Sequence, residues 1–541
     1  MEPHCIPFTG IPHTPSLFAD LLYRFSRVAA FYEYDPFEPA SFSAAAREIQ
    51  HDPEALQRRA AVAEVLAEQN RFFGGDRKTE ENIKRLRSGQ ALAVVTGQQV
   101  GLFGGPAYSV YKALTAIRLA GRLTADGLPA VPVFWLASED HDFAEVNHCF
   151  LLDSGHQWRE LRDPSIQPGN TPVGRIVFDP SIEALRDQLV RLWPAEASAE
   201  AEDLLAGYAQ DATYAQAFGR LFQRLFAGQG LVVLDPLHPA LHALSRPVLR
   251  RALEEAARLY ALVRGRDREL SKGGYDVQVR LRENATLLFL MANGRRLPLR
   301  RRGREFVVEE RDGRSLAELL DELEAAPERF SGNVLLRPVV QDWLLPTVAY
   351  VAGPNEAAYF GQASVLYKEL LGRMPVIFPR ASLTLVEPKV RRLLEKYGLE
   401  LTDFFHGEAP VRARLAERHL PAGLQRRLQG GEARLEQMLA ETTGELKKLD
   451  PTLAGAAATS RRKMLYQFGK LRRQAARAQA ERKAIIGRHL EVLIHSLYPE
   501  RGLQERRLNF LSIVARQGPD VVERLFEQVN FPCRDHQVVL L

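Results

Sequence analysis

Cysteine is scarce in this chain of 541 residues, which contains only Cys5, Cys149 and Cys533. Cysteines so few and so widely separated exclude the disulfide framework of a small secreted protein and a four-ligand zinc knot. Long apolar runs are also missing, because no stretch approaches the roughly 18 apolar residues of a membrane span. The first ten residues lack the basic-then-apolar order of a secretory signal. The sequence therefore predicts a protein of the reducing cytoplasm with no membrane partner.

The composition is otherwise that of a soluble globular protein. Hydrophobic residues make up 46% of the chain and charged residues 26%. The length predicts two or three bodies of structure. The net charge of +5 is unevenly placed, because residues 387–541 alone carry +9. Such an excess fits a solvated helix face, an acidic partner, nucleotide phosphates or nucleic acid, and charge alone does not choose among them.

Short apolar runs alternate with helical patterns over much of residues 1–386. The strand-like runs are ALAVVTGQQ, AVPVFWLASEDHD, LVVLDP, TVAYVA and PVIFPR. Since strands separated by helices form parallel sheets, we expect an α/β core with a doubly wound parallel sheet over residues 1–386. We interpret a helical segment at about 150–230 and a β-rich segment at about 275–335 as insertions. In the second, Asn293-Gly294 predicts a hairpin turn.

Residues 387–541 have a helical pattern throughout. Two heptad registers at about 424–495, separated by DPTLAGAAAT, predict an antiparallel coiled-coil hairpin. Such an arm usually packs against a partner helix, although two long helices packed on their own domain fit the same pattern. Residues 461–483 hold nine Lys and Arg and one acidic residue. A basic helix of this kind is also compatible with RNA binding, but nucleic acid is not the partner we expect.

The first candidate site is the glycine-containing turn TGQQVGLFGGP, which follows a strand and precedes a helix. Its backbone amides and the helix N-terminus favour an anion. The spacing matches neither the dinucleotide fingerprint nor the P-loop, and a tight turn followed by a surface lysine is the alternative. The candidates for binding or neutralising a phosphate or carboxylate here are Thr96, Gly97, Gln98, Gln99, Gly104, Gly105, Tyr108 and Lys112.

The second candidate site is the group Glu139, Asp140, His141 and Asp142, with Glu145, Asn147 and His148 close behind. It follows a buried strand, at the position where open α/β sheets bind ligands. Carboxylates there could hold an amine, a ribose hydroxyl or Mg²⁺, and the imidazole could act as a general base or contact a phosphate. The alternatives are a mononuclear metal-hydrolase set, built from Asp140, His141, Asp142 and His148, and a solvated turn.

The third candidate site follows the strand TVAYVA. Gly353, Pro354, Glu356 and Tyr359 open the next helix, and Arg380 ends the strand after it, where a bidentate contact to a carboxylate or phosphate is available. Upstream, the polar side chains of Arg337, Gln341 and Asp342 stand among apolar residues, where burying them unpaired would be costly. Polar groups at three strand ends predict a ligand-binding crevice.

Four long segments resemble one known family. They are TGQQVGLFGGPAYSVYKALTAIRLA, PVFWLASEDHDFAEVNH, LLRPVVQDWLLPTVAYVAGPNEAAYFGQ and MPVIFPRASLTLVE. In this order and at these separations they resemble the cysteine-adding enzymes of bacillithiol biosynthesis, the cysteine ligase family, over essentially the whole chain. The resemblance implies a Rossmann-like core related to class I aminoacyl-tRNA synthetases and nucleotidyltransferases. It also implies connecting-peptide-like insertions and a coiled-coil domain that forms a homodimer.

The resemblance further implies the last step of bacillithiol synthesis, in which the cysteine carboxylate is joined to the glucosamine amine of glucosaminyl malate. Because forming an amide from a free carboxylate is uphill in water, we expect a nucleotide co-substrate, ATP or another, acting through an adenylate or an acyl phosphate. ADP is a further expected ligand and Mg²⁺ a candidate ion, and no tightly bound metal is expected. Neither the His-x-Gly-His nor the Lys-Met-Ser-Lys-Ser signature of class I synthetases occurs.

We therefore hypothesise the following roles. The turn of residues 96–106 binds the activating phosphate or the malate carboxylate, Lys112 neutralises developing charge, and residues 139–142 hold amine and nucleotide groups. The third candidate site closes the opposite side of the crevice. Two other classes stay open: a synthetase- or nucleotidyltransferase-like enzyme for another amino acid, and a non-catalytic nucleic-acid-binding protein that uses the basic helix.

Overall fold

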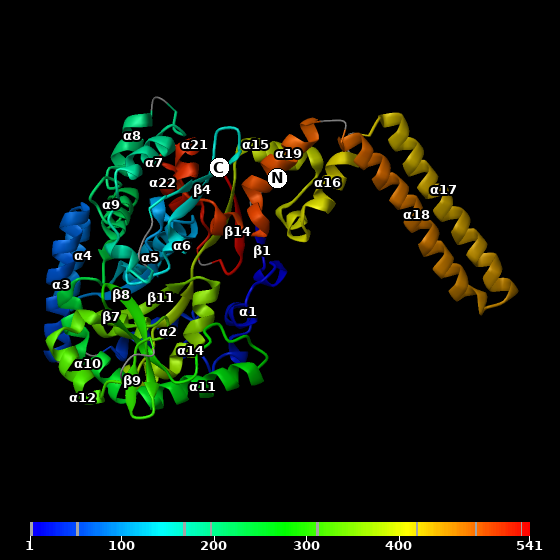
Figure 1. Cartoon of the computed structure of the whole chain (residues 1–541). Coiled ribbons are helices and arrows are strands. Elements are labelled where there is room, and N and C mark those ends of the chain that lie inside the picture. The colour runs from blue at the N-terminus through cyan, green and yellow to red at the C-terminus, as the bar shows by residue number, and fades with distance from the viewer. Residues whose placement is uncertain are drawn as a thin grey trace.

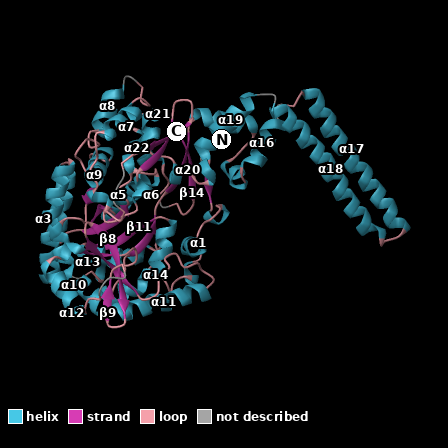
Figure 2. Ribbon diagram, in the orientation of Figure 1, coloured by secondary structure: helices cyan, strands magenta, loops and turns pink. Residues whose placement is uncertain are grey.

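A computed structural model describes residues 4–49, 53–165, 169–194, 197–309, 313–417, 420–481, 484–531 and 533–541. A body that contains all the strands carries a long arm made only of helices (Figures 1 and 2). The two ends of the chain lie close together on the body (Figure 1). No helix in the described part of the chain combines the length and apolar character needed to cross a membrane.

The centre of the body is a parallel sheet of five strands in the order β12-β11-β2-β3-β6. Numbered along the chain and read from the β6 edge, this is the 3-2-1-4-5 order of a Rossmann fold, and the order reverses between β2 and β11. The structure therefore confirms the predicted Rossmann-like core. The five strands are β2 (Leu92–Gln98), β3 (Ala130–Leu136), β6 (Val232–Leu234), β11 (Thr347–Ala352) and β12 (Val376–Pro379).

Helices cover both faces of this sheet, so its strands are almost entirely buried and mostly apolar. Ala93 and Val95 pack on one face, against α1, α3, α10 and α14. Leu92 and Val94 pack on the other face, against α2 and α5. These helices are α1 (Ser16–Tyr23), α2 (Pro39–Arg47), α3 (Pro53–Phe73), α5 (Tyr108–Ala125), α10 (Pro239–Glu254) and α14 (Pro354–Leu371).

Two segments extend from the sheet. Between β3 and β6 the chain forms a strand pair and helices, and between α10 and β11 it forms an antiparallel sheet in the order β10-β7-β8-β9. Asn293 and Gly294 join β7 to β8 with φ of 52° and 74°, so the predicted hairpin turn is confirmed. The helix α4 (Arg77–Arg87) precedes β2. The elements of the two segments and the helices beside them are α6 (Phe143–Val146), β4 (His148–Leu152), β5 (Trp158–Arg162), α7 (Ser181–Val190), α8 (Ser198–Leu205), α9 (Tyr214–Leu225), α11 (Ala256–Lys272), β7 (Ala285–Ala292), β8 (Arg295–Arg302), β9 (Glu305–Val307), α12 (Leu316–Ala325), β10 (Phe330–Gly332) and α13 (Arg337–Leu344).

The arm consists of α17 and α18, which run side by side away from the body (Figure 1). α17 ends at Leu449 and α18 begins at Leu453, so the turn between them is shorter than the segment DPTLAGAAAT. Within this turn Asp450 accepts hydrogen bonds from the backbone and hydroxyl of Thr452. Residues 482–483 of the basic run lie outside the described residues. The helices are α15 (Pro388–Tyr397), α16 (Glu408–Glu417), α17 (Ala422–Leu449), α18 (Leu453–Glu481), α19 (Ala484–Leu497), α20 (Gln504–Arg507), α21 (Leu511–Gln517) and α22 (Val521–Gln528).

The pattern of residues 387–541 predicts helices to the end of the chain, and the structure shows that this prediction is wrong for the last residues. It finishes in β14 (His536–Leu540), which pairs in parallel with β13 (Ser382–Val386) and antiparallel with β1 (His4–Ile6). The segment HQVVL has too few residues to show a period, and a partner strand more than 150 positions away stabilises it as a strand. These strand pairs attach the C-terminal end of the chain to the body beside the N-terminus.

Candidate functional site

A cleft of about 810 Å³ opens at the carboxyl ends of the parallel strands, where the strand order reverses. We call it the switch-point cleft. Its floor is made by the ends of β2 and β3 and the N-terminus of α14, and its outer wall by the β7–β8 hairpin. Open α/β sheets bind their ligands at this place. The sequence-predicted residues that line the cleft are Gly97, Gln98, Gln99, Tyr108, Lys112, Glu139, Asp140, His141, Arg337, Gly353, Pro354, Glu356, Tyr359 and Arg380.

Lys112 is the buried cation at the centre of the floor. From the first turns of α5 its Nζ donates to Gly97 O at 2.6 Å and Gln98 Oε1 at 2.9 Å. The alternative of a surface lysine is therefore wrong, because the side chain is buried. It also lies 2.5 Å from Glu356 Oε2 at the start of α14. Burial lowers the pKa of Lys112 to about 8, while the carboxylate of Glu356 opposes the fall. The ammonium group therefore holds its charge at neutral pH and loses it in mildly alkaline solution.

The N-terminus of α14 is tightly packed around Gly353. Its N–H donates to Glu356 Oε2 at 2.8 Å, and a Cβ at this position would lie 3.3 Å from that oxygen and 3.4 Å from Arg380 Nε. Arg380 Nε is buried and has no hydrogen-bond partner among the described residues. A helix N-terminus beside a buried guanidinium is an arrangement that binds anions.

Asp140 and Glu139 lie where β3 ends. Asp140 accepts hydrogen bonds from the backbone N–H of His141 at 2.7 Å and from Gln99 Nε2 at 2.6 Å. Glu139 Oε1 is 3.6 Å from His242 Nε2 on α10. The Asp140 carboxylate therefore already holds the β2 and β3 turns together. In the described residues, no three His, Cys, Asp or Glu side chains form a metal-binding group.

His141 is held by Arg296, a residue that the sequence analysis did not select. Arg296 comes from β8, is buried, and donates to Ser331 Oγ at 2.9 Å and Gly332 O at 2.7 Å. Its Nη1 lies 3.3 Å from His141 Nδ1. Because a guanidinium only donates, Nδ1 must accept and Nε2 must carry the proton. Burial and the charge of Arg296 lower the pKa of His141, so a neutral imidazole offers an N–H to the cleft.

Seven predicted residues do not line the cleft. Thr96 is buried and donates to Val351 O, which ties β2 to β11. Asp142 caps α6 through the N–H of Glu145. Asp342 is buried under α14 and accepts from Tyr367 Oη at 2.7 Å, so its role in the structure is to hold two helices together. The others are Gly104, Gly105, Asn147 and Gln341.

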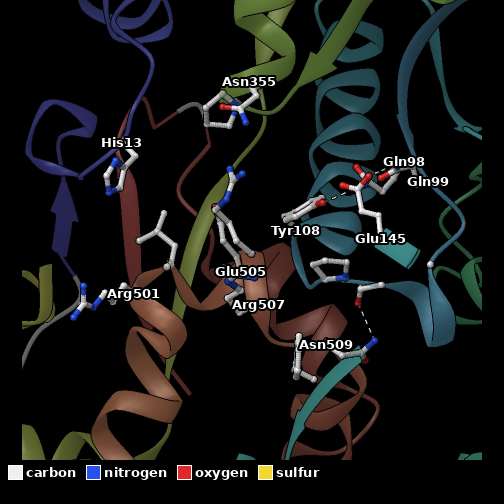
Figure 3. A pocket seen from close by; sticks show the side chains of 18 of the residues that line it. His13, Gln98, Gln99, Tyr108, Glu145, Asn355, Arg501, Glu505, Arg507 and Asn509 are labelled. Atoms are coloured by element: carbon white, nitrogen blue, oxygen red, sulfur yellow. Dashed lines mark hydrogen bonds between the residues drawn. The ribbon is translucent and has the colours of Figure 1, made fainter. Parts of the chain in front are cut away.

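A second cavity of about 590 Å³ adjoins the cleft and is lined partly by the C-terminal region (Figure 3). We call it the side cavity. Gln99 and Glu145 line both cavities, and Gln99 Nε2 donates to Glu145 Oε2 at 2.9 Å and to Asp140. Asn509 donates to Gly105 O at 2.8 Å and so fixes the glycine turn from the C-terminal side. The cations of this cavity are Arg501, Arg506 and Arg507, with His13 opposite (Figure 3).

Arg380 forms a buried ion pair across the two parts of the chain. Its Nη atoms donate to both oxygens of Glu505 on α20 at 2.9 Å and 2.7 Å. Ser382 Oγ donates to the same carboxylate at 2.8 Å. The bidentate contact predicted for Arg380 is thus taken by a carboxylate of the protein itself, and its remaining Nε is directed toward Gly353.

The fold and the charged cleft define a Rossmann-like α/β enzyme with an appended coiled-coil domain. The family model "Bacillithiol biosynthesis BshC, N-terminal Rossmann-like domain" matches residues 1–381, and "Bacillithiol biosynthesis BshC, C-terminal coiled-coil domain" matches residues 383–541. The chain therefore belongs to the BshC family of bacillithiol biosynthesis, and it is an enzyme of the ligase class.

Three curated relatives show how completely the chain matches this family. A protein of Koribacter versatilis is 41% identical, and the match covers 100% of both chains. One of Solibacter usitatus is 41% identical over 99% of both chains. One of Salinibacter ruber is 34% identical over 99% of this chain and 98% of its own. Each of the three is named "Putative cysteine ligase BshC".

Proposed function

We propose that the enzyme joins the carboxyl group of cysteine to the glucosamine amine of glucosaminyl malate, the last step of bacillithiol synthesis, with ATP or a related nucleotide as co-substrate. The observation that carries this proposal is the placement of a cation-rich cleft at the switch point of the sheet. Membership of the BshC family and the printed names of its curated members support the choice of cysteine as the substrate.

The charge of the cleft suits anionic ligands. Eight cationic side chains line it against four carboxylates. A surplus of this kind favours phosphates and the two carboxylates of a malate group. Arginine in particular matches the geometry of a carboxylate or phosphate. The eight are Lys112, Arg280, Arg282, Arg296, Arg300, Arg337, Arg380 and Arg506, and the four are Glu139, Asp140, Glu145 and Glu356.

The floor of the cleft fits the activated carboxyl group. Lys112 and the Nε2–H of His141 both line the cleft, and either can donate to an oxygen on which negative charge develops. The N-terminus of α14 and Arg380 Nε bind a phosphate or carboxylate beside them. These groups are held by buried contacts, so little reorganisation is needed as charge develops.

The attacking amine needs a proton acceptor, and we assign this role to Glu145. Its carboxylate lies at the boundary between the cleft and the side cavity and is exposed. Asp140 is less suited, because both of its oxygens already accept hydrogen bonds. Two adjoining cavities that meet at a carboxylate allow the amine and the carboxyl substrate to approach from different sides.

The test is product formation by the purified full chain, followed by mass spectrometry. We expect bacillithiol from cysteine, glucosaminyl malate, ATP and Mg²⁺, and none when the nucleotide is omitted. Serine or alanine in place of cysteine tests the alternative amino acids. If one of these is joined instead of cysteine, or if no mixture gives an amide, the proposed function is wrong.

A further inference from the structure

Two of the three cysteines lie against each other although they are 528 positions apart. Cys5 is in β1 and Cys533 is in the turn that leads into β14, and their Sγ atoms are 3.4 Å apart. Cys5 is exposed and Cys533 is partly exposed, whereas Cys149 is buried. The two thiols therefore have both a partner and access to small molecules in solution.

The surrounding backbone keeps the two thiols in this position. Cys5 stands opposite Gln537 in the antiparallel pair of β1 and β14. The N–H of Asp535 donates to Cys533 Sγ at 3.4 Å. Tyr23 Oη accepts from the N–H of Phe8 at 2.9 Å and donates to Asp535 Oδ1 at 2.6 Å. Tyr23 therefore links the segment just after Cys5 to the segment that contains Cys533. To form a bond, the two sulfur atoms must approach from 3.4 Å to about 2.0 Å.

We propose that Cys5 and Cys533 form a reversible intramolecular disulfide by exchange with a small-molecule disulfide of the cystine type. One protein thiolate attacks the small disulfide, releases one small thiol and forms a mixed disulfide. The second protein thiolate then attacks the protein sulfur of that mixed disulfide and releases the second small thiol. In total the protein loses two electrons and two protons, and the small disulfide is reduced to two thiols. This inference is independent of the proposed function.

Either thiol can make the first attack, because Cys5 is exposed and Cys533 is partly exposed. The second thiol closes the bond from its present position, since the two Sγ atoms are already in contact. Partial desolvation and the neighbouring thiol of Cys533 raise the pKa of Cys5, so we expect the exchange to be faster in alkaline solution.

The disulfide would fix one wall of the side cavity. Phe8, Ile11 and His13 follow β1 directly and line that cavity, with His13 directed toward the arginines of the C-terminal region (Figure 3). A covalent link at Cys5 holds this segment on the strand that ends the chain. Oxidation should therefore slow amide hydrogen exchange in residues 4–15.

The experiment uses the full-length protein, first reduced and then incubated with cystine. Trypsin cuts after Arg24, Arg524 and Arg534, so the two cysteines fall in separate peptides. We expect these peptides joined in non-reducing mass spectrometry, released by dithiothreitol, in a chain that still migrates as a monomer on a denaturing gel. The exchange of residues 4–15 should slow in the oxidised wild type.

Single variants give the matched controls. In Cys5→Ser and Cys533→Ser the remaining thiol should keep the added cysteine as a stable mixed disulfide, and hydrogen exchange should not slow. Cys149→Ser should behave as the wild type. The proposal is overturned if both thiols of the wild type are capped separately, if both stay free, or if the link joins two chains. None of these readouts depends on ligase activity.

Discussion

Lys112 on α5 and Glu356 on α14 form an ion pair of 2.5 Å between Nζ and Oε2 across the point where the strand order reverses. α5 follows β2 and α14 follows β11, so the pair joins the first βα unit to the fourth. Lys112 also donates to the last residues of β2, and Glu356 accepts from the N–H that opens α14. One buried pair thus sets the relative position of the two turns that form the cleft floor.

Replacing Lys112 should strongly reduce catalysis. Lys112→Met keeps the length of the side chain but removes the charge, and we expect kcat/KM to fall by about 100-fold or more, as when one donor to a developing oxyanion is lost. Lys389 on α15 is exposed, so Lys389→Met is the matched control. Steady-state kinetics of both variants measure the change in kcat/KM. Unchanged kcat/KM in Lys112→Met would remove the lysine from the mechanism.

The pKa of Lys112 also predicts a pH profile. Because burial lowers this pKa to about 8, the ammonium form dominates at pH 7 and is lost as the pH rises through 8. Wild-type kcat/KM should therefore decline on the alkaline side with a midpoint near pH 8. In Lys112→Arg the guanidinium stays charged, and the alkaline decline should disappear even if the activity is lower. A decline of the same midpoint in this variant would contradict the assignment.

Arg296 should act as a positioning residue for His141. In Arg296→Met the imidazole loses its donor at Nδ1 and is free to take either tautomer, and we expect kcat to fall about 10-fold or more with a smaller change in KM. The neighbouring Arg295 carries the control, because it pairs with Glu309, which follows β9, and does not line the cleft. Kinetics of Arg295→Met should match the wild type. An equal loss in both variants would indicate a general effect on the hairpin.

The Arg380–Glu505 pair should stabilise the junction between the core and the C-terminal part. Both side chains are buried, with 2% and 1% of their surfaces exposed. Arg380→Met leaves the carboxylate buried without its cation, which should cost about 3–5 kcal/mol in the free energy of unfolding. The double variant Arg380→Met with Glu505→Leu should recover much of this loss. Denaturant unfolding measures both, and a double variant as unstable as the single one would contradict this account.

Acid should destabilise the protein partly through His536. Burial lowers the pKa of this histidine to about 4. Between this pH and about 6.5 the imidazole therefore stays neutral in the folded chain but is protonated in the unfolded chain. Its contribution is complete above pH 6.5 and falls as the pH drops toward 4, by at most about 1.4 kcal/mol per pH unit. In His536→Asn the slope of unfolding free energy against pH should be smaller in this window. An unchanged slope in His536→Asn would contradict this prediction.

The arm should join two copies of the chain. Met438 and Leu471, at heptad positions of α17 and α18, each leave 53% of their surface exposed in the single chain. Glutamate at both positions should convert a dimer into a monomer in light scattering, because charges in a coiled-coil seam oppose pairing. The same substitution at exposed Tyr466 serves as the control. A wild type that is already monomeric would contradict this prediction.

Much of the fold follows from local patterns. Apolar runs that end in polar residues locate β2, β3 and β11, and Asn293-Gly294 locates a hairpin, because these signals lie within a few neighbouring residues. The same patterns bring Lys112 and Glu356 to one cleft, since parallel strands share a carboxyl edge.

The remaining features depend on distant partners. β14 is a strand because β1 and β13 flank it, and nothing in its five residues reveals that. Arg296 is one of several arginines on its hairpin, and only the docking of that hairpin shows that it turns inward. Asp342 looks like a ligand-binding carboxylate in the sequence, yet its partner is Tyr367. In each case the local sequence shows which residues are present, while the structural role of each residue depends on a partner that is distant in the sequence.

The most direct measurement follows oxygen from cysteine labelled with ¹⁸O in its carboxyl group. If the nucleotide activates that carboxylate in the cleft, one labelled oxygen must leave with the phosphate or nucleoside monophosphate when the amide forms. We predict ¹⁸O in that product at one atom per bacillithiol in the wild type, and labelled product formed about 100-fold or more slowly in Lys112→Met. Bacillithiol formed without label in any nucleotide product would contradict the account.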